Sequence, residues 1–221
     1  MEREWRERHP GTDLVLSVVT GSRAYGLQTE GSDIDRRGVF VAPTAAFWRL
    51  DKPPTHLDGP LEEQFSWEVE RFCVLALQAN PTLLECLWSP IVEHVTPVGE
   101  RLLGLRTAFL SGRARQSFLG YAQDQFRRLD PAAPKWKQAM HMIRLLLSGR
   151  HLVEYGEPLV RVGEDRERLL AIRRGELTWA EVDAWRAELT TGLSRAAGHL
   201  PAEPDRAAVE AFLIEVRRAA L

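Results

Sequence analysis

The stretch TGSRAYGLQTEGSDIDRRGVFV, from Thr20 to Val41, decides how this chain is interpreted. It begins with the pair Gly21-Ser22 and continues, after ten residues, with Asp33 and Asp35 separated by one isoleucine. In a β-strand, residues i and i+2 project from the same face, so we expect the two carboxylates side by side and the isoleucine in the core. Carboxylates this close repel each other unless a basic partner, raised pKa values or a divalent cation compensates them. Oxygen ligands suit Mg²⁺ or Mn²⁺, so the spacing indicates either a metal site or a solvated acidic turn.

The turn before the acidic pair favours the metal site. The β-branched run of residues 13–19 predicts a strand that ends directly before Gly21. Glycine lets the backbone approach a phosphate closely, and the Ser22 hydroxyl and main-chain N–H groups can bind phosphate oxygens. Arg23 and Arg37 flank the acidic pair and can neutralise its charge. A plain strand-ending turn would explain Gly21 equally well when it is considered alone.

Composition restricts the class of protein. The chain has 221 residues, of which 44% are hydrophobic and 27% charged, so it can bury a sizeable core. Its formal net charge is -2 and its pI is about 6.3, so no overall basic field attracts nucleic acid or an anionic membrane. The first residues are charged and no apolar run approaches 18 residues, which predicts a cytoplasmic protein without a membrane partner. The two cysteines have no metal-site spacing and are interpreted as reduced core residues.

The chain divides into two consecutive regions with different predicted secondary structure. Residues 1–95 alternate strand-like and helix-like segments, including a second strand at RRGVFVAP and a third at LEEQFSWEV. Residues 96–221 show long helical periodicity without clear strands, and the clearest helices start near Arg113 and Trp136. A capping box at Thr178 predicts the start of another helix. We therefore predict an α/β domain over residues 1–95 and a helical domain over residues 96–221.

The spacing of Gly21-Ser22 and Asp33-Ile34-Asp35 resembles the signature of the DNA polymerase beta nucleotidyltransferase superfamily. The longer motif GSRAYGL…GSDIDRRGVFV is similar to one branch in particular, the predicted nucleotidyltransferases that include RNA-repair-pathway members. The segments NPTLLECLWSP and KQAMHMIRLLLSGRHL also resemble that branch. The resemblance implies an α+β or α/β fold, in which a small mixed sheet with flanking helices is followed by a helical C-terminal part that packs on the site.

The resemblance also implies an activity and a site. The expected reaction is metal-dependent transfer of a nucleoside monophosphate from an NTP, ATP included, to a hydroxyl acceptor. An RNA or DNA 3′ end, as in nucleic acid repair or modification, is one acceptor of this kind. Asp33 and Asp35 would be catalytic ligands of Mg²⁺ or Mn²⁺, and Gly21, Ser22 and Arg23 would bind the nucleotide.

A third carboxylate usually completes such a metal site. Set against family members, Glu63 stands where an aspartate is common, so we expect Glu63 as the third catalytic and metal-binding residue. Glu62 and Glu68 are rivals, and strand alternation does not choose among them. A longer carboxylate in this position can serve as the general base for the acceptor hydroxyl, whereas a displaced one would leave the second metal ion weakly held.

Three potential cations follow helical spacing in the second region. Lys137, His141 and Arg144 stand at i, i+4 and i+7, which aligns them on one stripe of a helix. Such a stripe is either a solvated face with a partly buried histidine or a clamp for the β- and γ-phosphates of an NTP. The resemblance favours the clamp, because it places this helix opposite the sheet.

Two classes of function therefore remain open. The first is an active nucleotidyltransferase. The alternative is a catalytically impaired nucleotide-sensing or protein-binding module that keeps the fold. The position of the third carboxylate separates the two, since convergence of Asp33, Asp35 and one glutamate on a single point favours the enzyme.

Overall fold

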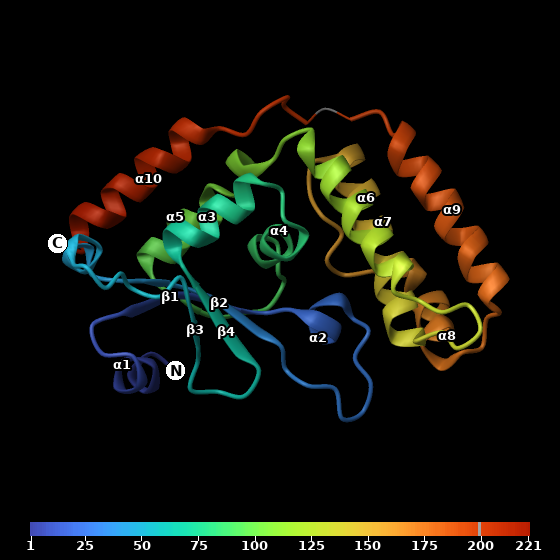
Figure 1. Ribbon diagram of the computed structural model, residues 1–221, viewed down its shortest axis with the longest axis horizontal. Coiled ribbons are helices and arrows are strands. Elements are labelled where there is room, and N and C mark those ends of the chain that lie inside the picture. Colours follow the sequence, from blue (N-terminus) through green and yellow to red (C-terminus); the bar gives the residue numbers. More distant parts are fainter. Residues whose placement is uncertain (199) are drawn as a thin grey trace.

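The computed structural model describes residues 1–198 and 200–221. Its N-terminal part contains a sheet of five strands (Figure 1). In chain order the strands are β1 (Asp13–Val19), β2 (Arg36–Val41), β3 (His56–Asp58), β4 (Gln64–Glu68) and β5 (Val92–Val95). Their order across the sheet is β3-β4-β2-β1-β5. Strands β2 and β4 are parallel, and the other neighbouring pairs are antiparallel. The prediction of a small mixed sheet is confirmed.

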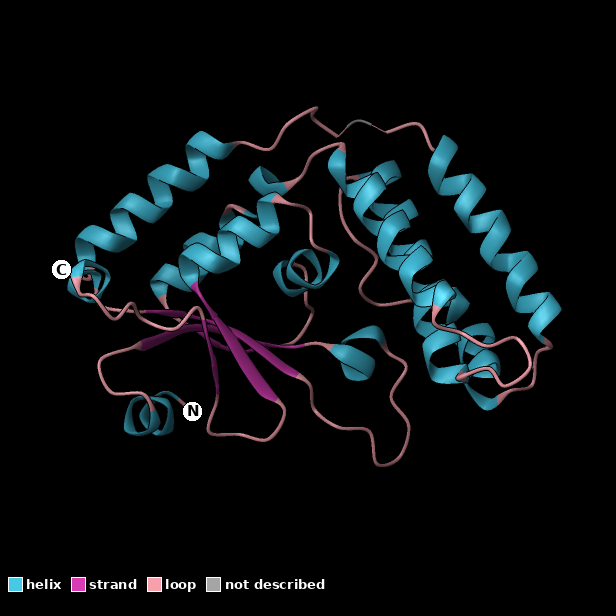
Figure 2. Cartoon of the chain, in the orientation of Figure 1, coloured by secondary structure: helices cyan, strands magenta, loops and turns pink. Residues whose placement is uncertain are grey.

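Helices cover the sheet and form the rest of the chain (Figure 2). The α-helices of the described residues are α1 (Glu2–Arg8), α2 (Gly21–Tyr25), α3 (Val69–Leu77), α4 (Pro81–Leu87), α5 (Pro97–Gly104), α6 (Arg113–Arg127), α7 (Trp136–Tyr155), α8 (Arg166–Arg174), α9 (Trp179–Arg195) and α10 (Arg206–Ala219). Short 3₁₀ segments are η1 (Thr44–Trp48), η2 (Arg106–Phe109) and η3 (Gly163–Asp165).

The two faces of the sheet carry different layers. Trp5 of α1 packs on one face against Leu14 and Phe40. The opposite face is covered by α3, α4 and α5, with α10 beside them (Figure 1). Helix α7 packs against α6, α8 and α9 to form the helical part of the chain. One core cluster contains buried residues from Val15 in the sheet to Val216 in α10. Buried side chains therefore join the sheet to the helical part. The predicted domain boundary at residue 95 stays a prediction.

Local signals account for several of the helix ends. Asn80 accepts a hydrogen bond from the Thr82 N–H at the start of α4, so the Asn80-Pro81 pair begins a helix as well as ending the previous segment. Thr178 and Glu181 form the predicted capping box of α9. Gly156 ends α7 in the left-handed conformation with φ of 80°.

The structure also differs from the sequence predictions in several places. The segment around DKPPTHLDGP, which is rich in turn residues, contains the short edge strand β3, and β5 lies just before the helical region. Strand β2 begins at Arg36, so Asp33, Ile34 and Asp35 precede the strand and Ile34 is half-buried instead of being in the core. Both cysteines are buried and free, as predicted. Within the described ranges, no helix has both the length and the apolar character needed to cross a membrane.

Candidate active site

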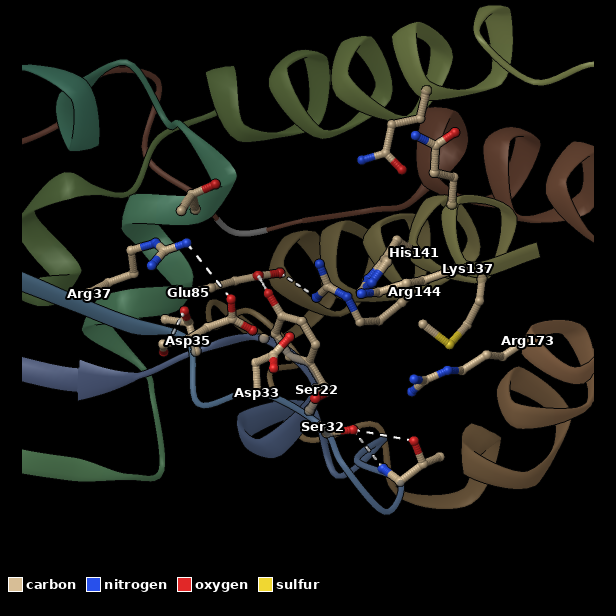
Figure 3. Close-up of a pocket in the computed structure, with 18 of the residues that line it drawn as sticks. Ser22, Ser32, Asp33, Asp35, Arg37, Glu85, Lys137, His141, Arg144 and Arg173 are labelled. Atoms are coloured by element: carbon tan, nitrogen blue, oxygen red, sulfur yellow. Dashed lines mark hydrogen bonds and ion pairs between the residues drawn. The ribbon is translucent and has the colours of Figure 1, made fainter. Parts of the chain in front are cut away.

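A cavity of about 560 Å³ opens where the sheet meets the helical part of the chain. On the sheet side it is lined by α2 and by the loop that leads into β2. Helices α4, α6, α7 and α8 supply the other walls. Figure 3 shows Ser22, Ser32, Asp33 and Asp35 on one side of this cavity, with Lys137, His141 and Arg173 on the other. Acidic and hydroxyl groups thus face basic groups across the space.

The Gly21-Ser22 turn is packed tightly against the acidic pair. Gly21 has φ of 65°, and a Cβ built on it would overlap Oδ2 of Asp35 and lie 2.7 Å from its Cγ. Only glycine allows both the left-handed backbone and this close approach. The Thr20 N–H donates to the Asp35 carbonyl at 2.8 Å, which joins the end of β1 to the loop before β2. The turn and the second aspartate are therefore packed directly against each other.

Asp33 and Asp35 both line the cavity. Asp33 is exposed and Asp35 half-buried. The nearest basic group to Asp35 is Arg37, whose Nη2 lies 3.9 Å from Oδ1. Two carboxylates beside a cavity of this size fit Mg²⁺, because this ion is commonly held by one or two carboxylates together with substrate phosphates and water. The donor chemistry therefore matches a metal ion that arrives with an NTP.

Arg23 lies outside the cavity lining and contacts the acidic loop from behind. Its Nη2 donates to the Ser32 carbonyl at 3.0 Å, and its Nε donates to the Asp33 carbonyl at 3.4 Å. The predicted nucleotide contact of Arg23 stays a prediction. Its observed contacts hold the loop that carries Asp33.

Glu63, the expected third carboxylate, does not line the cavity that holds the acidic pair. Glu63 has φ of 52° just before β4, and its carbonyl accepts from the Arg36 N–H at 2.9 Å and from Arg37 Nη1 at 3.1 Å. Glu62 and Glu63 line a neighbouring cavity, while Glu68 is buried and bound by Arg217 at 2.8 Å.

Arg37 lines both cavities and so lies on the boundary between them. Among the residues that the structure describes, no three His, Cys, Asp or Glu side chains are grouped as metal ligands. Whether Glu63, Glu62 or Glu68 completes the site therefore stays a prediction.

The three residues of the predicted clamp occupy different environments. Lys137, His141 and Arg144 all line the cavity, which agrees with their helical spacing. Arg144 is only 6% exposed, however, and its Nη1 donates to Oε1 of Glu85 at 2.6 Å. Burial works against its charge, but Glu85 and Tyr25 outweigh that effect and raise the pKa of Arg144. The Arg144 charge is thus already compensated within the protein.

His141 is neutral at physiological pH. Burial lowers its pKa to about 3, and the nearby cations Arg144, Lys137 and Arg173 lower it further in the same direction. Its ring stands edge-on to Tyr25 with 6.3 Å between the centroids. Of the predicted stripe, Lys137 brings to the cavity a charge that forms no ion pair with any described side chain.

Sequence reasoning missed several residues that line this cavity, Arg173 and Glu85 among them. Arg173 of α8 lines it beside Lys137, and its Nη1 donates to the Leu27 carbonyl at 3.1 Å. Glu85 of α4 lines it with an exposed fraction of 3%. The signal for Glu85 is present in PTLLECL, because one charged residue in an apolar run must find a buried partner. Arg173 has no comparable local signal.

Comparison with known proteins assigns the chain to a family. Residues 2–215 match the family described as the RNA repair pathway DNA polymerase beta family, RlaP. The chain belongs to the RlaP family. Among curated proteins it is similar to the uncharacterized protein YcgL of Bacillus subtilis (strain 168), with 26% identity over 156 residues. That alignment covers 68% of this chain and 60% of the relative, so the chain spans less than two thirds of that protein's length. No solved structure matches the chain.

Membership of the RlaP family confirms the resemblance seen in the sequence. The family match extends over nearly the whole chain, so it includes the sheet, the Gly21-Ser22 turn, the acidic pair and the helices α6 to α9. RlaP proteins are nucleotidyltransferase-like members of the DNA polymerase beta group that are linked to RNA repair.

Proposed function

We propose that this protein is a divalent-metal-dependent nucleotidyltransferase that transfers a nucleoside monophosphate from an NTP to a hydroxyl. The observation that carries the proposal is the contact of Gly21 with Asp35, which packs the glycine-serine turn and the acidic pair into one unit at the cavity edge. A phosphate-binding turn and a pair of metal ligands must be adjacent for in-line displacement at phosphorus. The RNA-repair description of the family supports the 3′ hydroxyl of RNA as the acceptor.

Each group in the cavity has a proposed role. Asp33 and Asp35 would hold Mg²⁺ or Mn²⁺, which when bound supplies Lewis-acid polarisation of the phosphate and orients the attacking hydroxyl. The main-chain N–H groups of the turn and the Ser22 hydroxyl bind phosphate oxygens. Lys137 and Arg173 lie on the facing wall and neutralise the triphosphate from the other side.

Transfer of label tests the proposal directly. The protein is incubated with each α-labelled NTP, with Mg²⁺ or Mn²⁺, and with RNA and DNA oligonucleotides that have a free 3′ hydroxyl. We expect label on an oligonucleotide with the wild type and none with Asp33→Asn or Asp35→Asn. Both variants should keep the wild-type circular dichroism and melting temperature, because these side chains lie at the cavity and outside the core. Full transfer by either variant would contradict the assigned metal ligands.

One observation favours the alternative of a nucleotide-sensing module. Glu63 lines the neighbouring cavity and does not line the one that holds the acidic pair, whereas an active site of this type usually has a third carboxylate beside that pair. A module of this kind binds NTP at the same turn without passing label to any acceptor. NTP binding by the wild type together with no transfer to any oligonucleotide would favour it over the enzyme.

A further inference from the structure

A buried triad of Tyr25, Glu85 and Arg144 lines the cavity, and none of the three is among the groups proposed above to contact the metal ion or the NTP. Glu85 of α4 accepts a hydrogen bond from the Tyr25 hydroxyl at 2.8 Å through Oε2 and from Arg144 Nη1 at 2.6 Å through Oε1. The Arg144 guanidinium also lies over the Tyr25 ring, with 3.8 Å from Cζ to the centroid. All three side chains are buried. Each residue therefore contacts the other two.

The triad joins three elements that are far apart in the sequence. Tyr25 is the last residue of α2, the short helix that begins at Gly21, while Arg144 lies two turns along α7 from Lys137. Glu85 is separated from Tyr25 by 60 positions and from Arg144 by 59. Glu85 thus fixes the phosphate turn and the cationic helix to the same anchor on α4 (Figure 3).

Stability alone does not explain such an arrangement. A buried ion pair loses the solvation of both charges, and well-packed apolar side chains of similar volume are often as stabilising or more so. Nε of Arg144 is buried without a hydrogen-bond partner in the described part of the chain, so the triad is not fully satisfied. Hydrogen bonds are directional, so a buried ion pair fixes one defined geometry better than apolar contacts do.

We propose that Glu85 is a positioning residue that, through Tyr25 and Arg144, sets the spacing between the Gly21-Ser22 turn and Lys137 so that both contact the same triphosphate. This inference rests on the proposed NTP site, but not on transfer of the nucleotide. It assigns Arg144 to the support of the site instead of direct phosphate binding. Loss of Glu85 frees the turn and α7 to shift relative to each other.

Two measurements on Glu85→Gln distinguish positioning from general destabilisation. The first is amide hydrogen exchange without nucleotide, followed at the turn, where the Leu27 N–H donates to the Ser22 carbonyl at 2.8 Å. The second is calorimetric titration with Mg-ATP and with inorganic triphosphate, well below the melting temperature. We expect faster exchange over residues 21–27 and roughly tenfold weaker binding of both anions, the change that loss of one charge-assisted hydrogen bond produces.

A control is available in a part-buried ion pair that lies away from the cavity. Arg217 binds Glu68 through two hydrogen bonds of 2.8 and 2.9 Å, and neither residue lines the cavity. Arg217→Gln breaks an ion pair with a buried glutamate, but it should leave both exchange at the turn and anion binding unchanged. If the Glu85 variant is too unstable to study, Tyr25→Phe removes the hydroxyl and keeps both charges. It should produce the same changes with a binding loss of roughly threefold.

A double-mutant cycle gives the decisive result. If Glu85 positions Lys137, then Lys137→Ala weakens triphosphate binding strongly in the wild type and much less in the Glu85→Gln background. Additive effects of the two changes, or equal behaviour of the Glu85 and Arg217 variants, would overturn the proposal. If the wild type binds triphosphate but transfers no label, the positioning role still holds and the proposed nucleotidyltransferase activity is contradicted. If the wild type binds neither ATP nor triphosphate, both the proposed NTP site and the positioning role are contradicted.

Discussion

Replacement of Gly21 by alanine tests the packing of the turn against the acidic pair. Alanine at φ of 65° is in the left-handed region, which costs about 1–2 kcal/mol of unfolding free energy for a residue with a Cβ. The new Cβ would also overlap the carboxylate of Asp35. That carboxylate is the far end of a rotatable side chain, so the fold can accommodate the change by moving it. A displacement of about 1 Å at a reacting group lowers the rate by roughly 100-fold.

Gly156 provides the matched control for this substitution. It has φ of 80° at the end of α7, and a Cβ there meets no atom within 4 Å among the described residues. Gly156→Ala should therefore show the same loss of stability in urea unfolding without loss of function. For Gly21→Ala we expect that stability loss together with roughly 100-fold slower label transfer and weaker Mn²⁺ binding measured by electron paramagnetic resonance. Equal function in both variants would show that the turn does not hold Asp35 in place.

Two further predictions concern α7. Lys137→Ala should weaken ATP and inorganic triphosphate binding by roughly tenfold and leave adenosine binding unchanged, because it removes one charge from the phosphate wall; equal losses for adenosine and ATP would contradict this contact. The pKa of His141 is about 3 in the folded protein and about 6.5 in the unfolded chain. Between these pH values the unfolded chain binds a proton at His141 and the folded protein does not. Its contribution to stability is complete above pH 6.5 and declines as the pH falls toward 3, by at most about 1.4 kcal/mol per pH unit. Urea midpoints measured between pH 7 and 5 should show a shallower decline in His141→Gln.

Local sequence was sufficient wherever a structure depends on neighbouring residues. The β-branched runs predicted β1 and β2, and the Thr178 capping box predicted the start of α9. Gly21-Ser22 was expected at the end of a strand and lies there. Strand β3 was not predicted, because its three residues are held by pairing with β4 and have no periodicity of their own.

The charges of the site were harder to interpret from the sequence. Helical spacing correctly put Lys137, His141 and Arg144 on one side of α7, yet it carried no information about Glu85, which neutralises Arg144 from another element. The same limit applies to Glu63. Its position relative to Asp35 depends on the backbone just before β4, which is left-handed at that residue.

The sequence by itself determined the family, the glycine-serine turn, the acidic pair and the order of most elements, because each of these is encoded by spacing within one continuous segment. Only the tertiary structure decided which charges face the cavity free and which are already paired. Lys137 and Arg173 come from different helices, and the Tyr25–Glu85–Arg144 triad comes from three elements. Electrostatic pairing depends on distance in space and on burial, and neither quantity is contained in the spacing of residues along the chain.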